Sequence, residues 1–295
     1  YILDFIAALE KPLVTTFHTV FAEPPLPYRP IQEKIAAASD AIIVMNRQAI
    51  PYLVKAFGLP EEKIVYIPHG APGPSSENRD SLRRRLGFSG RKVMLTFGLL
   101  SRGKGIESVL AALPGVVRKV PEALYVIAGQ THPEVKKREG EAYRDELKAL
   151  IHRLGLDGHV RMEDRYFSEE ELIDYLTACD LYVTPYPGMQ QITSGTLAYA
   201  VGVGRPVVST PYEHARDLLR GCEELLLPYG DTARWEERLG QLLADEAALK
   251  RWEETVRQIG ANTHWPRVGE QHVALFERVC AAKRGEVKAV DFVSH

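Results

Sequence analysis

The chain has 295 residues, of which 45% are hydrophobic and 26% charged, and its formal net charge is −2 at pH 7. These values predict a globular chain long enough for two domains. No apolar run approaches the ~20 residues of a membrane span, and a near-neutral charge gives no electrostatic argument for binding nucleic acid or an anionic membrane. Three widely spaced cysteines, Cys179, Cys222 and Cys280, predict neither a metal site nor a disulfide framework, so a reduced, cytoplasmic setting is expected.

Short apolar runs alternate with segments of helical periodicity along the whole chain. Strands are expected at residues 14–17, 41–45, 64–67, 93–97, 124–128, 160–162, 181–185, 206–209 and 225–227. Helices are expected at residues 30–38, 48–57, 107–119, 134–154, 169–178, 196–203, 233–243, 246–259 and 267–280. Ser168 and Glu171 form a capping box at the start of the fifth of these helices. Strands separated by helices require crossover connections, so the fold class is α/β with parallel sheets.

A stretch rich in Gly, Pro and Ser at residues 71–78 predicts a linker between two domains. Residues 1–70 supply only three strands and are interpreted as the remnant of a first Rossmann-like domain. The chain opens at Tyr1 within a helical pattern, so we expect N-terminal sequence to be missing. Residues 79–260 supply a complete doubly wound domain, and residues 261–295 a helix that returns toward the first. The incomplete first sheet leaves an edge and an apolar face uncovered, which favours association.

The segment VMLTFGLLSRGKG, from Val93 to Gly105, carries the strongest chemical signal. A buried strand runs into a loop with three glycines, and a helix follows. Backbone N–H groups, the positive end of that helix and the cations Arg102 and Lys104 meet there, and such a combination binds phosphate. The alternative interpretation is that both cations are solvated loop charges, because a single glycine-rich loop is a weak signal.

A second polar loop follows the strand expected at residues 181–185. Unpaired N–H groups at the start of the next helix, together with Ser and Thr hydroxyls, can hold a second phosphate or the hydroxyls of a sugar. An ordinary helix cap needs one such side chain. This segment offers several, namely Gln190, Gln191, Thr193, Ser194 and Thr196, while Gly195 keeps the backbone accessible.

These motifs, in this order, resemble those of the nucleotide-sugar-dependent glycosyltransferases of family 4, also called group 1. FGLLSRGKG resembles the family's G-R-L-x-x-x-K-G phosphate loop, YFSEEELIDYLTACDLYVTPY the segment around the nucleotide base, and GVGRPVVST its small-G-x-P-V-V-x-S segment. VTTFHT resembles the first-domain strand that delivers a histidine, here His18, to the cleft, and IPHG resembles the family's I-P-N-G. THWPRVGEQHVALFERV resembles the family's C-terminal helix, which contains a Trp.

The resemblance implies a GT-B fold of two Rossmann-like doubly wound domains, the first only partly present here. It also implies transfer of a sugar from a nucleoside diphosphate to a glycan, lipid or small-molecule acceptor, with retention of configuration and with no metal or other cofactor. The sequence contains no Asp-x-Asp and no His/Cys cluster at the spacing of metal ligands, in agreement with the metal-independent transfer that the resemblance implies. The catalytic candidates are Arg102, Lys104 and His18. The donor-binding candidates are Gly98, Ser101, Gly103, Tyr166, Gln191, Ile192, Thr193, Ser194, Gly195, Thr196 and Tyr199.

Two features depart from the family pattern. The family's loop arginine falls on Leu99, so Arg102 is the candidate replacement. The family's two glutamates, which contact the donor sugar and the ribose, fall on Gln191 and Tyr199. Both keep hydrogen-bonding capacity without the charge. Two alternatives therefore stay open: a non-catalytic module that binds nucleotide sugars, or another GT-B enzyme such as a sugar-nucleotide epimerase or a phosphorylase.

Overall fold

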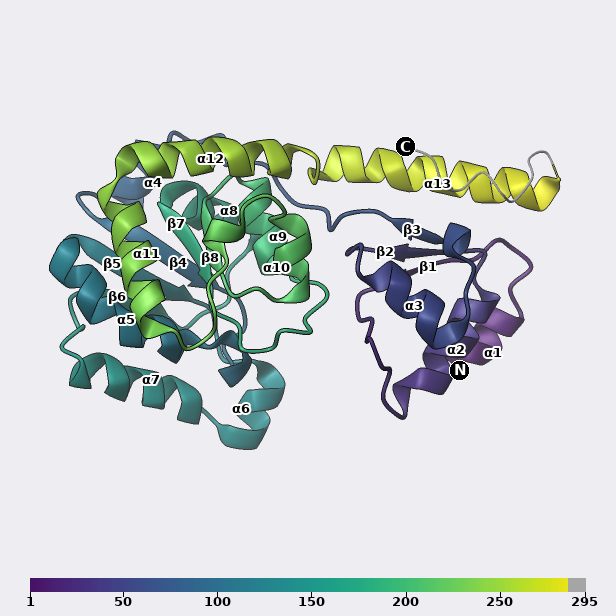
Figure 1. Cartoon of the computed structure of the whole chain (residues 1–295), viewed down its shortest axis with the longest axis horizontal. Helices are drawn as coiled ribbons and strands as arrows, with labels where there is room; N and C mark the ends of the chain where they lie inside the picture. Colours follow the sequence, from purple (N-terminus) through teal and green to yellow (C-terminus); the bar gives the residue numbers. More distant parts are fainter. Residues whose placement is uncertain (286–295) are drawn as a thin grey trace. The chain divides into compact units, whose positions relative to one another are not determined.

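The computed structural model describes residues 1–285, which divide into two compact units (Figure 1). Unit 1 contains Tyr1–Gly70, Gln190–Ser194 and the described residues from Trp265 onward, and unit 2 contains Ala71–Met189 and Gly195–His264. Each unit is built on its own parallel sheet, as the α/β fold class predicts. The short segment Gln190–Ser194, which the sequence assigns to the nucleotide-binding domain, groups with unit 1. Within residues 1–285, no helix has both the length and the apolar character needed to cross a membrane.

The sheet of unit 1 has three parallel strands in the order β1-β2-β3. The strands are β1 (Val14–Phe17), β2 (Ala41–Val44) and β3 (Ile64–Tyr66). The helices of this unit are α1 (Ile2–Ala7), α2 (Tyr28–Ala38), α3 (Ala49–Phe57), the 3₁₀ turn η1 (Glu61–Lys63) and α13 (Trp265–Arg284). Both crossovers that return the chain to a parallel neighbour contain a helix, which is the usual construction of such sheets.

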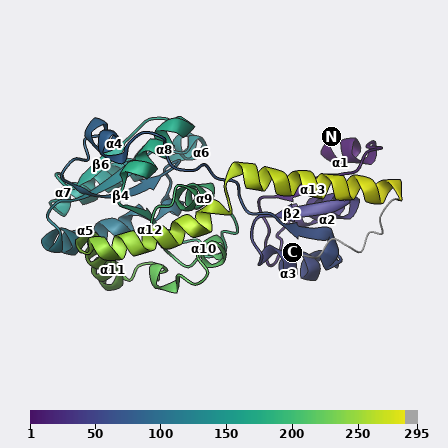
Figure 2. The ribbon, with the colours of Figure 1, turned by 90° about the horizontal axis from the view of Figure 1, so that it is seen from above.

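The expectation of an uncovered apolar face on this small sheet is wrong, because helices cover both faces. Successive side chains along each strand point to opposite faces. In the central strand β2, Ile42 and Val44 pack into a core that includes Ala36 of α2 and Leu53 of α3. The intervening residues Ala41 and Ile43 point to the other face. There they pack against Val268, Leu275 and Val279 of α13, the long helix that runs beside the sheet in Figure 2.

Unit 2 has a five-stranded parallel sheet in the order β6-β5-β4-β7-β8. The strands are β4 (Lys92–Phe97), β5 (Ala123–Ala128), β6 (Val160–Glu163), β7 (Leu181–Thr184) and β8 (Val207–Ser209). The helices are α4 (Arg79–Arg85), α5 (Ile106–Lys119), α6 (Pro133–Glu139), α7 (Ala142–Arg153), α8 (Glu169–Ala178), α9 (Gly195–Gly202), α10 (Glu213–Leu218), α11 (Thr232–Ala244) and α12 (Glu246–Ala261), with the 3₁₀ turns η2 (Arg102–Lys104) and η3 (Glu223–Leu225).

The strand order of unit 2 reverses at β4, which pairs with β5 on one side and with β7 on the other. The chain leaves β4 and β7 at the same carboxyl edge of the sheet, so the two following loops are neighbours there. A reversal of this kind opens a crevice where doubly wound proteins bind ligands. The loops with the strongest sequence signals are therefore the two loops that leave the sheet at this switch point.

Most of the expected elements are confirmed with ends within three residues of the expected ones, although α13 ends four residues later than expected, and three further details differ. The strand expected at residues 225–227 is wrong: the chain forms η3, and one parallel bridge joins Leu226 to Ser209. A short apolar run does not by itself distinguish a strand from a buried turn. The single helix expected at residues 134–154 is also wrong, because Gly140 with φ +61° separates α6 from α7. The short helices α4 and α10 were not expected, although Asn78 caps α4 by accepting from the amides of Asp80 and Ser81.

Candidate active site

The loop between β4 and α5, residues 98–105, folds tightly against the end of β7. It turns through η2, where the amide of Lys104 donates to the carbonyl of Ser101 over 2.9 Å. Gly105 ends the turn with φ +63°, and a Cβ placed on it would lie 2.1 Å from the carbonyl oxygen of Pro185. Only glycine permits this conformation and this close approach. The loop and the chain after β7 therefore form one continuous surface.

Lys104 lies where three elements of unit 2 meet. Its Nζ donates to Tyr186 Oη over 2.7 Å and lies 4.6 Å from the centre of the same ring. Tyr186 Oη is in turn 2.9 Å from Thr196 Oγ1, at the start of α9. A Cβ on Gly98 would lie 3.1 Å from the Lys104 ammonium and 3.3 Å from Thr196. The structure thus brings together Lys104, Gly98 and Thr196, three of the residues expected at the phosphate site.

The hydrogen-bond partner of the Lys104 ammonium is the hydroxyl of a tyrosine rather than a carboxylate. Within the part of the chain that the structure describes, no carboxylate lies close enough to form an ion pair with it. The ammonium has three N–H donors, of which Tyr186 takes one. Lys104 is only half-buried, so the other donors are available to an anionic ligand.

Arg102, in contrast, turns toward α6 and α7. Its guanidinium forms a two-pronged ion pair with Glu146, with N–O distances of 2.7 and 2.6 Å, and lies 3.6 Å from Glu139. It also lies over the ring of Tyr143, 5.2 Å from its centre. The hydrogen bond to Glu146 raises the pKa of Arg102 and lowers that of Glu146. The structure therefore places Arg102 among carboxylates rather than beside Lys104.

Sequence reasoning missed one carboxylate beside the loop. Glu107, in the first turn of α5, accepts hydrogen bonds from Tyr143 over 2.5 Å and from Tyr229 over 3.0 Å. Burial and this carboxylate raise the pKa of both phenols, so both stay protonated as donors. An acidic side chain at a helix N-terminus is stabilised by the helix dipole. No local sequence pattern links it to tyrosines so far along the chain.

The remaining candidates of unit 2 also lie near the carboxyl edge of its sheet, but their hydrogen-bond partners and exposure differ. Tyr199, one turn into α9, donates to Glu169 over 2.7 Å, and burial and this carboxylate raise the pKa of the phenol to about 12. Tyr166 is exposed in the chain before α8. Gly195 begins α9, and Ser101 and Gly103 lie in the β4–α5 loop. The position that the resemblance assigns to ribose binding thus carries a phenol that donates to a carboxylate.

Four donor-binding candidates, Gln191, Ile192, Thr193 and Ser194, belong to unit 1. The side chain of Ile192 is 5% exposed and packs into the core formed by β1, β2, α2 and α3. Gln191 Nε2 donates to the carbonyl of Thr193 over 3.1 Å, which closes a small turn around the buried isoleucine. Ser194 is also buried. No local sequence pattern indicates that this loop packs into a core formed by residues far from it along the chain.

Two histidines lie at the carboxyl edge of the sheet of unit 1. His18 follows β1 directly and is exposed. His69 follows β3 and is half-buried, and its Nδ1 is 2.7 Å from the carbonyl oxygen of Gly70. Burial lowers the pKa of His69, the contact with Gly70 partly offsets this, and the nearby His18 lowers the pKa further. His18 thus follows the first strand of unit 1 directly, and a second imidazole lies near it.

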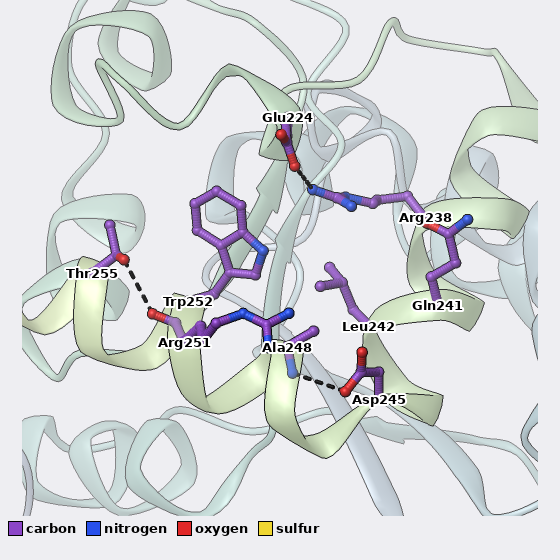
Figure 3. A pocket seen from close by; sticks show the side chains of 9 residues that line it. All are labelled: Glu224, Arg238, Gln241, Leu242, Asp245, Ala248, Arg251, Trp252 and Thr255. Carbon is purple, nitrogen blue, oxygen red and sulfur yellow. Dashed lines mark hydrogen bonds and ion pairs between the residues drawn. The ribbon is translucent and has the colours of Figure 1, made fainter.

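A cavity of about 550 Å³ lies elsewhere in unit 2, between η3, α11 and α12 (Figure 3). Its polar groups mostly bind one another. Arg238 pairs with Glu224 over 2.9 Å, and Asp245 accepts from the amide of Ala248 over 2.9 Å. None of the elements that line it carries a candidate residue. This cavity is therefore separate from the edge that holds Lys104.

Comparison with known proteins agrees with these features. Residues 91–245 match the family described as "Glycosyl transferases group 1", and residues 2–72 match "Glycosyltransferase Family 4". A D-inositol 3-phosphate glycosyltransferase of Xylanimonas cellulosilytica is 27% identical over 277 residues, which cover 87% of this chain and 64% of that protein. A GDP-mannose-dependent alpha-(1-6)-phosphatidylinositol monomannoside mannosyltransferase of Mycolicibacterium smegmatis is 26% identical over 52% of this chain and 38% of that protein. The chain therefore spans less than two thirds of these relatives.

Solved structures show the same fold. Sucrose-phosphate synthase from Thermosynechococcus elongatus superimposes with a TM-score of 0.78 at 20% identity, over 95% of this chain and 70% of that one. Anabaena HepE, solved in complex with UDP and glucose, gives a TM-score of 0.75 at 19% identity, over 91% and 72%. With the two parallel sheets and the matched segments in both units, the chain belongs to the group 1, or family 4, glycosyltransferases, and its fold is of the GT-B type.

Proposed function

We propose that this chain is the donor-binding part of a glycosyltransferase that moves a sugar from a nucleoside diphosphate to an acceptor, with retention of configuration. The observation that carries the proposal is the Lys104 ammonium, which lies at the switch point of a doubly wound sheet and is bound by a neutral hydroxyl. The family membership supports the same reaction class. The names of the relatives support glycosyl transfer as well.

Transfer of a sugar from a nucleoside diphosphate is favoured by a cation beside the β-phosphate. Breaking the bond between the sugar C1 and the diphosphate oxygen leaves an oxocarbenium-like sugar, while negative charge grows on the β-phosphate. Groups that bind this charge more strongly in the transition state than in the ground state accelerate the reaction. Lys104, together with the amides at the start of α9 near Thr196, would fill this role. Retention is tested by the NMR coupling constant of the anomeric proton in the product.

Transfer is proposed to be independent of a metal ion. The sequence contains no Asp-x-Asp, and Lys104 supplies positive charge that a diphosphate would otherwise take from Mg²⁺. The full-length enzyme, assayed with excess EDTA, is therefore expected to keep its rate. Loss of activity that Mg²⁺ or Mn²⁺ restores would contradict this part of the proposal.

The other candidates have proposed roles away from the phosphates. His18 would orient the sugar or the acceptor, and Gln191, Thr193 and Ser194 would bind the sugar hydroxyls. Replacing Gln191 with Ala would then weaken discrimination among donors. A lost hydrogen bond to a neutral partner is worth about 0.5–1.5 kcal/mol, so this change is expected to be modest.

Calorimetric titration with a series of nucleotide sugars tests the proposal directly. UDP- and GDP-sugars come first, because HepE was solved with UDP and the mycobacterial relative is named as GDP-mannose-dependent. We expect this chain to bind one of them. We also expect full-length protein to release nucleoside diphosphate in the presence of an acceptor. Binding without turnover by the full-length protein would favour the non-catalytic alternative.

A further inference from the structure

The hydroxyl of Tyr186 connects two groups that come from different loops. It accepts a hydrogen bond from Lys104 Nζ over 2.7 Å and lies 2.9 Å from Thr196 Oγ1. Since Lys104 has no acceptor lone pair, the direction of the first bond is fixed. In the second contact either hydroxyl can be the donor. A lysine of the β4–α5 loop and a threonine of α9 are thereby held through one oxygen atom.

We propose that Tyr186 is a positioning residue, which holds the Lys104 ammonium and the Thr196 hydroxyl in the arrangement that receives the diphosphate of the donor. This inference rests on the proposed function of Lys104. A lysine side chain has four flexible methylene groups, so a fixed direction of its ammonium has to come from a partner. Tyr186 supplies that partner, and the family resemblance assigned no role to it.

Tyr186 is itself rigid. Its side chain is only 2% exposed, and its ring stacks on that of Tyr212, with centres 5.2 Å apart and planes inclined by 21°. Its carbonyl oxygen accepts from Thr210 Oγ1 over 2.6 Å. Both ring and backbone are therefore fixed by the core of unit 2. The hydroxyl oxygen of such a ring has a smaller range of positions than a polar atom on a flexible surface side chain.

The chemistry of the partner also matters. A carboxylate beside Lys104 would hold the ammonium as firmly, yet it would neutralise the charge that an anionic ligand needs. A phenol accepts the same hydrogen bond and remains neutral. Tyrosine thus fixes the direction of Lys104 without competing electrostatically with the diphosphate.

The test replaces Tyr186 with Phe, which keeps the stacked ring and removes only the oxygen. We expect the affinity for UDP, GDP or ADP, whichever the parent chain binds, to fall about tenfold or more, the effect typical of a hydrogen bond to a charged group. Tyr212→Phe is the matched control. It removes a buried hydroxyl from the other ring of the same stacked pair, where the hydroxyl lies 3.1 Å from Thr184 Oγ1, and it should leave nucleotide affinity unchanged.

A double-mutant cycle separates positioning from an independent contact. If Tyr186 acts through Lys104, Tyr186→Phe causes no further loss of nucleotide affinity in a Lys104→Ala background. A full additional loss there would overturn the inference. An unchanged affinity in Tyr186→Phe would also overturn it, provided that Lys104→Ala alone weakens binding. If Lys104→Ala itself has no effect, the proposed function fails rather than the role of Tyr186.

An NMR measurement on the ligand-free protein distinguishes the loss of this hydrogen bond from a general change in folding. In protein labelled with ¹⁵N at the lysine side chains, a hydrogen-bonded ammonium exchanges its protons slowly with water. We expect a Lys104 Nζ signal in the parent and in Tyr212→Phe, and its loss by exchange broadening in Tyr186→Phe. A Lys104 signal that persists in Tyr186→Phe would contradict the inference even if nucleotide binding changes.

Discussion

Arg102 and Lys104 lie in the same turn of one loop, yet their charges have opposite surroundings. Arg102 is fixed by the carboxylates of Glu146 and Glu139, whereas Lys104 is fixed by the neutral hydroxyl of Tyr186. An ion pair orders a cation and largely neutralises it, while a hydroxyl orders it and leaves the charge intact. Two cations that look equivalent in the sequence are therefore unequal as binding groups for an anion.

The largest expected effect comes from removing the uncompensated cation. Lys104→Ala should raise the activation barrier for transfer by the full-length enzyme by about 2.7–4 kcal/mol. This is the cost of losing one hydrogen-bond donor to a developing oxyanion. Steady-state rates at saturating donor measure this. Lys148→Ala, which removes an exposed lysine of α7, is the control and should be silent. If Lys104→Ala keeps activity within a few-fold of the parent, Lys104 is not the more important of the two cations for transfer.

Arg102→Ala should have a much smaller effect on transfer, because the carboxylates already satisfy this guanidinium. The same assay, with the donor below its KM and then at saturation, measures the effect on binding and on rate separately. Thermal unfolding should change little, since exposed ion pairs contribute little to stability. A loss as large as that of Lys104→Ala would show that Arg102 leaves Glu146 when the donor binds, and the two cations would then act together.

Glu146→Gln tests the difference between Arg102 and Lys104 by changing the carboxylate partner of Arg102 instead of the cation. It removes the negative charge that holds Arg102 and leaves a side chain of nearly the same shape. If position rather than charge keeps Arg102 away from the ligand, nucleotide affinity measured by calorimetry should not change. Tighter binding in Glu146→Gln would indicate that the carboxylate restrains a second phosphate-binding cation.

The smallest effect is a change in titration. The hydrogen bond from Arg102 lowers the pKa of Glu146 below its ordinary value of 4.5. A carboxylate whose pKa is lowered by folding contributes its stabilisation above the unfolded pKa and loses it as the pH falls through the folded pKa. In Arg102→Ala, an NMR titration of the Glu146 carboxyl should show a pKa close to 4.5. An unchanged, lowered pKa would mean that another group holds this carboxylate.

The fold was predictable because its signals are local. Apolar runs such as that of β5 and capping patterns such as Ser168 with Glu171 depend on residues that are close in sequence. Two failures have the same origin. The run at residues 225–227 is apolar because it is buried, although it forms no ladder, and the helix signal at residues 134–154 continues through Gly140, where the backbone does not.

The sequence by itself determined the alternation of strands and helices, and thereby that a loop with Gly98, Arg102 and Lys104 leaves a central strand at its carboxyl edge. Only the tertiary structure decided which partner each side chain has. Lys104 meets Tyr186, 82 residues away, and Arg102 meets Glu146, 44 residues away. Ile192, expected at the donor, is buried in the core of unit 1. The physical reason is that periodicity is set by neighbouring residues, whereas the surroundings of a charge are set by whichever distant elements pack against it.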